Sequence, residues 1–207
     1  MVSKSMHELN SSHLESIHMK KLLVVAALAS TFMATSAFAQ GYIGFGLGSA
    51  TIRGANSTSG LVTVTGGDSS KGSAKIYGGF QFTPNWGLEA QYSDLGSRNY
   101  TVTTAGVVTG SGNARSSQYS LAGTGTVPLG TNFALIGKLG VSANRAGYPG
   151  SNNKTSLMAG VGVSYSITPR LAVRLEYEDF GKFADNNGFG GGSIRGTNTS
   201  LSLNYAF

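Results

Sequence analysis

The sequence contains no cysteine, so disulfides cannot contribute to the stability of the fold. Histidine is nearly as scarce, since its three copies (His7, His13 and His18) all precede residue 19. Histidine is the usual catalytic base at neutral pH, so its absence from the rest of the chain argues against an enzyme. No stretch of eighteen consecutive apolar residues occurs either, and a membrane-spanning helix is therefore not expected.

Charged residues are also few, at 12% of the chain. From residue 40 onward, twelve lysines and arginines stand against seven aspartates and glutamates, a net charge of +5. The basic residues do not alternate with aromatics in a cluster, so nucleic acid is not an expected partner. The basic balance favours contact with an anionic surface such as lipopolysaccharide, although the ordinary solubility of loops explains it equally well.

The N-terminal part has the pattern of an export signal. Residues 1–18 are polar and unpatterned, and Met19-Lys20-Lys21 then precedes a short apolar run that ends at Met33. Ala37-Phe38-Ala39 supplies a small-x-small cleavage site, so residues 19–39 are predicted to be a signal peptide. Met19 is the expected initiator, with a genuine pro-segment at residues 1–18 as the alternative. The remaining 168 residues, 40–207, suffice for one domain.

The last seven residues, 201–207, alternate strictly between apolar and polar side chains. Because side chains in a strand point alternately to its two faces, this segment is a strand with two different environments. In a soluble sandwich the apolar face would point inward, whereas in an outer-membrane barrel it would face lipid.

Seven earlier segments of about ten residues show the same alternation, which is hard to reconcile with disorder despite the high content of glycine. All eight are 42–49, 75–83, 86–94, 118–127, 133–143, 155–165, 171–178 and 201–207. Gly44, Gly46 and Gly48 are expected to be the small inward residues of a tight barrel. Their likeness to a phosphate-binding loop is superficial, because no helix follows.

The connections alternate between short, proline-bearing turns and long polar loops. Short turns are expected around Pro84, Pro128 and Pro169, and long loops at 50–71, 95–117, 144–154 and 179–198. This pattern predicts an all-β fold, an eight-stranded antiparallel up-and-down transmembrane β-barrel whose first and last strands pair. Segments 61–65 and 100–104 have strand chemistry and should form hairpins beyond the membrane.

With this order of strands and turns, the chain resembles the eight-stranded transmembrane domain of OmpA-like outer-membrane proteins. The resemblance covers residues 41–207 and is carried by two strand–turn–strand segments, 77–96 and 162–177. It implies a location in the Gram-negative outer membrane, without the periplasmic peptidoglycan-binding domain of full-length OmpA. It further implies that Leu203, Tyr205 and Phe207 form the signal read by the outer-membrane assembly machinery.

The resemblance also implies ionic pairs inside the barrel. The matching positions are Glu89, Lys138, Arg174 and Glu176. Three positions depart from the family, since Gly46, Thr124 and Ser164 replace charged lumenal residues. An eight-stranded barrel is only wide enough to be filled by side chains, so we expect a plugged lumen that Arg174→Ala would destabilise and open. The many small inward residues argue the opposite way, because they leave room for water.

Aromatic residues should form two girdles at the membrane interfaces. The short-turn girdle is predicted to contain Trp86, Phe133, Tyr165, Tyr205 and Phe207, and the long-loop girdle Tyr92, Tyr119, Tyr177 and Phe180.

Three functions compete for such a barrel. The first is a structural or surface-interaction role, in which the loops contact lipopolysaccharide or unknown surface ligands. The second is a small passive pore. The third, an enzyme, is disfavoured because enzymes on such barrels rely on histidine. No cofactor is expected, and the oxygen ligands of Glu178, Asp179, Asp185 and Asn187 are better explained by a solvated acidic loop than by a metal site.

Overall fold

The structure is a computed structural model that describes residues 40–53, 57–65, 69–146, 153–185 and 193–207. The proposed signal peptide and the preceding extension lie outside these residues. The described residues form ten strands: β1 (Gln40–Arg53), β2 (Ser57–Ser59), β3 (Val62–Thr65), β4 (Ser69–Gln81), β5 (Trp86–Thr104), β6 (Val107–Pro128), β7 (Phe133–Ala146), β8 (Lys154–Ser166), β9 (Leu171–Asp185) and β10 (Ser193–Ala206). Among the described residues, no helix is long and apolar enough to cross a membrane.

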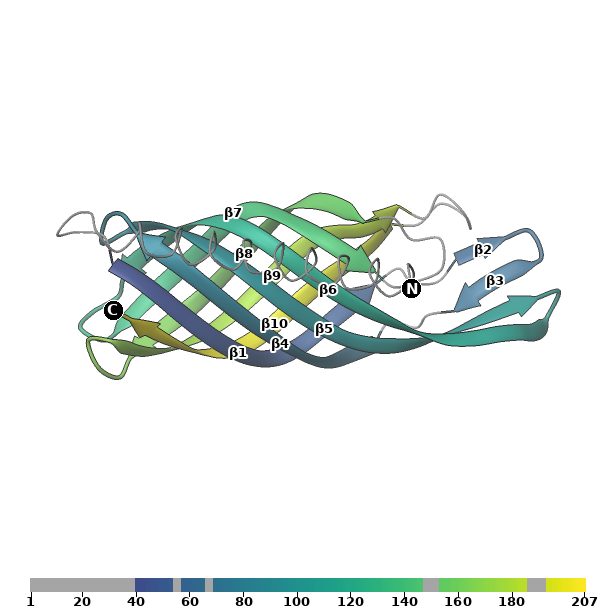
Figure 1. Ribbon diagram of the computed structural model, residues 1–207, viewed down its shortest axis with the longest axis horizontal. Helices are drawn as coiled ribbons and strands as arrows, with labels where there is room; N and C mark the ends of the chain where they lie inside the picture. Colours follow the sequence, from purple (N-terminus) through teal and green to yellow (C-terminus); the bar gives the residue numbers. More distant parts are fainter. Residues whose placement is uncertain (1–39, 54–56, 66–68, 147–152, 186–192) are drawn as a thin grey trace, which may run out of the picture. The chain divides into compact units, whose positions relative to one another are not determined.

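Eight of these strands close into a ring, as Figure 1 shows. Each strand pairs antiparallel with its neighbours in the order β1-β4-β5-β6-β7-β8-β9-β10, and β10 pairs with β1 from Ala206 opposite Tyr42 to Arg195 opposite Arg53. The predicted eight-stranded up-and-down barrel and the predicted pairing of its first and last strands are therefore confirmed. Closure leaves no ring strand with a free edge along the wall, as a lipid environment requires.

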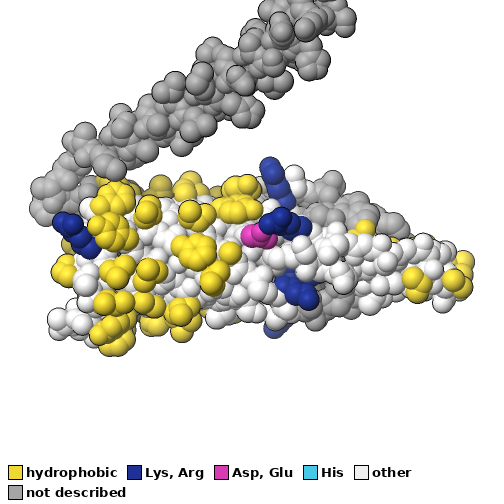
Figure 2. All heavy atoms as spheres, turned by 60° about the horizontal axis from the view of Figure 1, so that its bottom comes forward, with side chains coloured by type: hydrophobic (Ala, Val, Ile, Leu, Met, Phe, Trp, Pro, Cys, Tyr) yellow, Lys and Arg dark blue, Asp and Glu magenta, His cyan; other side chains and the backbone are white. Residues whose placement is uncertain are grey.

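The alternation in the sequence sets the two faces of the wall. In β1, Ile43, Phe45 and Leu47 point outward and are 54–60% exposed, while Gly44 and Gly46 between them are buried inside. In Figure 2, hydrophobic side chains gather over the barrel wall on the face drawn, and most of the Lys and Arg side chains lie at the boundary toward the long-loop end. The wall is thus apolar outside and packed inside.

The strands extend much further into the expected loops than the alternation predicts. Segment 95–117 is not a polar loop, because β5 continues to Thr104 and β6 begins at Val107. The register shifts between Asp94 and Ser97, where Gly96 has a φ of 76°. This bulge adds one residue, so the inward positions of β5 change from odd to even residue numbers. A search for strict alternation therefore ends the strand at the bulge, although the strand continues.

Beyond the ring, β2 and β3 form a short hairpin, and β3 pairs with the far end of β5. The β5–β6 turn has positive φ at both Ala105 (51°) and Gly106 (82°), as a type I′ hairpin turn requires. The backbone N–H of Ala105 donates to the carbonyl of Leu61 in the β2–β3 turn at 2.7 Å. The two expected hairpin segments therefore belong to one sheet extension, visible at the right of Figure 1.

Candidate functional site in the barrel lumen

Six charged side chains meet inside the barrel, and each is at most 5% exposed. Four of them are the residues implied by the family resemblance: Glu89 on β5, Lys138 on β7, and Arg174 and Glu176 on β9. The structure adds Lys75 on β4 and Glu178 on β9. With three carboxylates and three cations, we call this set the lumenal network.

Glu176 is the carboxylate on which all three cations converge. Its Oε2 lies 2.5 Å from Nζ of Lys75, and its Oε1 lies 2.6 Å from Nζ of Lys138 and 2.8 Å from Nη2 of Arg174. Because β4, β7 and β9 lie apart around the ring, the contacts with Lys75 and Lys138 cross the lumen, whereas Arg174 lies beside Glu176 on β9.

The other two carboxylates each bind two cations. Glu89 lies 2.6 Å from Lys138 and 3.0 Å from Arg174, and it also accepts a hydrogen bond from the Tyr42 hydroxyl at 3.0 Å. Glu178 lies 3.1 Å from Lys138 and 3.2 Å from Lys75. Buried charges are tolerated only when they are paired and hydrogen-bonded, and here every member has at least two partners of opposite charge.

The ring of Tyr77 lies close to all three cations of the lumenal network. Its centroid is 4.8 Å from the Arg174 guanidinium carbon, 5.4 Å from Nζ of Lys75 and 5.5 Å from Nζ of Lys138, within the range of cation–π contacts. A Cβ at Gly44 would lie 2.1 Å from this ring, and one at Gly162 would lie 2.7 Å from Cγ of Glu176. The small inward residues therefore make room for large side chains, and the expectation that they leave space for water is wrong at these positions.

Sequence reasoning missed Lys75 and Glu178. Lys75 shares the parity of the inward Tyr77, so the alternation alone could have placed it in the lumen. Glu178 is fully buried, and its assignment to a solvated acidic loop is wrong. Glu178 is the last residue of the expected strand 171–178 and shares the parity of Arg174 and Glu176, so the alternation could have placed it in the lumen as well. Among the described residues, no group of three or more Asp, Glu, His or Cys side chains could hold a metal ion.

A cavity of about 190 Å³ lies in the lumen on the short-turn side of the network. Its lining includes Tyr42, Arg174, Thr124 and Ser164. The last two are the positions where the resembled family carries charged residues. The cavity therefore lies where the second ionic pair is missing.

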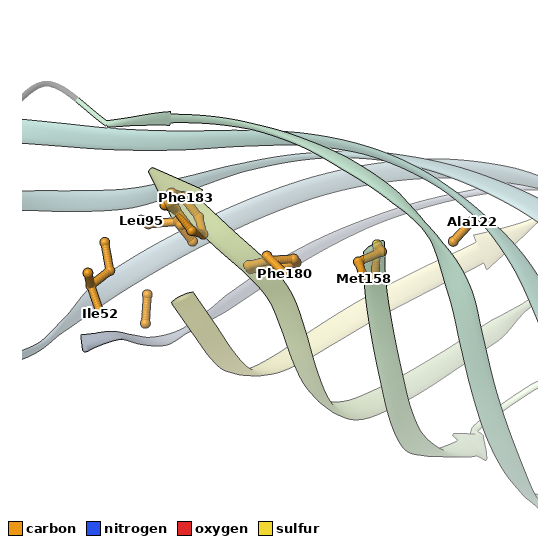
Figure 3. Packing of buried hydrophobic residues seen from close by; sticks show 7 residues of the cluster. Ile52, Leu95, Ala122, Met158, Phe180 and Phe183 are labelled. Atoms are coloured by element: carbon orange, nitrogen blue, oxygen red, sulfur yellow. The ribbon is translucent and has the colours of Figure 1, made fainter. Parts of the chain in front are cut away.

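An apolar cluster is packed inside the barrel, mostly on the long-loop side and beyond Glu178 along β9 (Figure 3). We call it the apolar plug; it comprises Ala50, Ile52, Leu95, Ala122, Met158, Phe180 and Phe183. The rings of Phe180 and Phe183 meet edge-on, with centroids 6.5 Å apart. Both point inward because Gly181, with a φ of 68°, adds a residue between their positions. The expectation that Phe180 belongs to the outer girdle is wrong, since it is fully buried.

The remaining predicted girdle residues lie on the outer wall. Trp86, Phe133 and Tyr165 are 42–65% exposed near the short turns, and Tyr177 is 50% exposed toward the long loops. Phe133 and Tyr165 pack against each other across β7 and β8, as do Tyr92 and Tyr119 across β5 and β6, with ring centroids 4.8–4.9 Å apart. Leu203, Tyr205 and Phe207 also point outward and are 44–52% exposed.

An antiparallel barrel of eight strands, with an apolar outer wall and a polar interior, defines an outer-membrane β-barrel. In agreement, residues 22–207 match the family described as outer membrane protein beta-barrel domain, and the chain belongs to this family. The protein is accordingly a protein of the outer membrane. No curated protein matches the sequence.

Several solved structures share this fold. Neisserial surface protein A is 16% identical, with 81% of this chain and 97% of that chain covered and a TM-score of 0.55. The outer membrane protein AlkL is 10% identical, with 84% and 93% covered and a TM-score of 0.52. Ail, the attachment invasion locus protein of Yersinia pestis, is 15% identical, with 82% and 99% covered and a TM-score of 0.50. At these identities the likeness concerns the fold alone.

Proposed function

We propose that this barrel is a closed, non-conducting outer-membrane protein with a structural or surface-interaction role at its long-loop end. The observation that carries the proposal is the lumenal network, whose ion pairs cross the interior between β4, β5, β7 and β9. The apolar plug supplies a second barrier above it. A permeating ion would have to break several short ion pairs and also pass the packed side chains of the plug.

The long-loop end supports the interaction part of the proposal. Strands β5 and β6 extend well past Asp94 and, with β2 and β3, present a sheet beyond the apolar belt. In outer-membrane barrels the long loops face the cell exterior, so this extension would be the part offered to surface ligands. Lipid and lipopolysaccharide would contact the wall, and the assembly machinery would read the C-terminal strand.

A small passive pore is the alternative, and the cavity of about 190 Å³ on the short-turn side favours it. This cavity would be the inner mouth of a channel if the network and the plug could open. An enzyme is not supported, because the sequence has no histidine after residue 18 and no cysteine.

Single-channel recording of the refolded protein in planar bilayers tests the proposal. The parent protein should show no stable open state. The sequence alone predicted that Arg174→Ala would open the lumen, but because the apolar plug remains in that variant, we now expect Arg174→Ala alone to stay closed. Arg174→Ala combined with Phe180→Ala and Phe183→Ala should conduct. Leu175→Ala, which changes the neighbouring lipid-facing residue, is the control and should stay silent. Large, stable, ohmic conductance from the parent, unchanged by Arg174→Ala, would promote the pore alternative.

A further inference from the structure

Three basic side chains face outward in direct register on adjacent strands at the long-loop end. Arg53 of β1 lies opposite Arg195 of β10, and Arg195 lies opposite Lys182 of β9. All three side chains are exposed. We call this set the basic ladder. Directly opposed residues have Cβ atoms only about 5 Å apart, and like charges in such pairs destabilise a sheet.

The ladder has no internal compensation among the described side chains, since none of its three cations forms an ion pair there. Asp179, three residues before Lys182, accepts the backbone N–H of Gly181 at 2.8 Å. Other outward arginines at this end do have partners. Arg115 pairs with Asp94, and Arg145 lies over the ring of Tyr119 at 5.7 Å.

The distance of the basic ladder from the apolar part of the outer wall limits which anionic groups could neutralise its charge. The outward apolar side chains end at Leu47 on β1 and at Leu201 on β10, each six residues away from the ladder arginine of its strand. Six strand residues span about 20 Å, or about 15 Å along the axis of a barrel whose strands tilt by about 40°. The headgroup layer of a phospholipid leaflet is only about 5 to 8 Å thick. Phospholipid phosphates would therefore lie below the ladder.

We propose that the basic ladder binds phosphate groups carried on the saccharide part of outer-leaflet lipopolysaccharide. Such phosphates extend beyond the phospholipid headgroups, and two guanidinium forks with an ammonium group suit bidentate recognition of a multiply charged phosphate. Binding would relieve the repulsion between the three opposed cations. The inference specifies the surface-contact part of the proposed function, and it does not depend on whether the lumen conducts.

The test uses the protein in phosphatidylcholine nanodiscs, titrated with phosphorylated or phosphatase-treated lipopolysaccharide. The parent should bind the phosphorylated form at least about tenfold more tightly. The variant Arg53→Gln/Arg195→Gln should bind both forms alike. The matched control Arg115→Gln/Arg145→Gln also removes two positive charges and should keep the preference of the parent. Without lipopolysaccharide, the ladder variant should unfold at the same or a higher urea concentration than the parent, because only repulsion is removed.

Three results would overturn the proposal. The first is an equal loss of preference in the ladder and control variants, which would indicate general charge attraction. The second is equal competition by phosphatidylglycerol or inorganic phosphate at matched phosphate concentration, which would show that a saccharide-borne phosphate is not needed. The third is a ladder variant that is less stable than the parent in phosphatidylcholine alone, which would mean that the cations already have a partner within the chain. None of these results concerns conductance, so the closed-barrel proposal stands or falls separately.

Discussion

Individual charged side chains in the lumen depend on one another because they are buried and paired mainly with each other. Glu176 contacts Lys75, Lys138 and Arg174 within 2.8 Å, and it is 2% exposed. Removing one member of a buried charge network leaves its partners uncompensated, which typically costs more than the network itself contributes.

Glu176→Gln keeps the shape of the side chain but removes its charge, and it leaves three cations against two carboxylates. We expect the free energy of unfolding to fall by about 3 to 5 kcal/mol. Urea unfolding in lipid vesicles measures this change. Asp94→Asn breaks the exposed ion pair with Arg115 and is the control, with an effect expected to be far smaller. Equal effects of the two substitutions would contradict the buried character of the network.

Gly44→Ala tests the packing of Tyr77 over its register partner on the neighbouring strand β1. The added Cβ would lie 2.1 Å from the ring, so Tyr77 must move away from the cations, and we expect a loss of about 1 to 3 kcal/mol in unfolding free energy. Gly137→Ala is the control on a comparable strand, because nothing lies within 4 Å of its added Cβ. The same urea titration compares the two, and a Gly44→Ala barrel as stable as the Gly137→Ala barrel would refute this packing.

At the level of the strands, the lumenal face of the wall carries charged or polar residues and the outer face carries apolar residues, and strand β9 has both kinds. Arg174 and Glu176 point into the lumen, whereas Leu175 between them is 49% exposed on the outer wall. A strand with period two can place a charge and an apolar residue side by side in sequence because they never share an environment.

Leu175→Arg should therefore impair insertion of the barrel into the membrane, although the preceding residue, Arg174, is an arginine that the lumen accepts. An arginine that faces lipid near the midplane costs about 2 to 4 kcal/mol. Folding into vesicles, followed by the gel shift of the folded barrel, measures the loss. Leu61→Arg is the control, because Leu61 is 74% exposed in the hairpin turn beyond the ring. Undiminished folding of Leu175→Arg would mean that the face assignment of β9 is wrong.

For the molecule as a whole, the seam between β1 and β10 is where the first and last strands of the barrel meet. Phe207 contributes little to the stability of this seam. Its backbone N–H adds one hydrogen bond, to the Gly41 carbonyl at 3.0 Å, and its ring is 52% exposed. The register from Tyr42 to Arg53 holds the seam without it.

Deletion of Phe207 should lower the amount of assembled barrel in cells while refolding of the purified protein in detergent remains largely intact. The reason is that the terminal residue would act through the assembly machinery, whereas the seam depends on the whole length of β10. Outer-membrane levels and refolding yields of the deletion and the parent measure the two effects. Equal levels in the outer membrane would count against a role as an assembly signal.

The sequence by itself determined the barrel, because a period of two is a local property of a strand. Within the eight expected strand segments the outward residues could be read off without knowing any contact, and the short turns at Pro84, Pro128 and Pro169 set the order of the strands. The same parity placed Arg174 and Glu176 inside, and it was also sufficient for Lys75.

Tertiary structure decided everything that depends on a break in that period or on register across the lumen. The bulges at Gly96 and Gly181 add one residue each, so they hid the length of β5 and turned Phe180 and Phe183 together into the interior. The partners of Glu176 come from three strands, and only the register of a closed ring brings them to one depth. The opposition of Arg53, Arg195 and Lys182 is likewise a matter of register, because Arg53 meets Arg195 only across the seam and Lys182 meets Arg195 only in the pairing of β9 with β10.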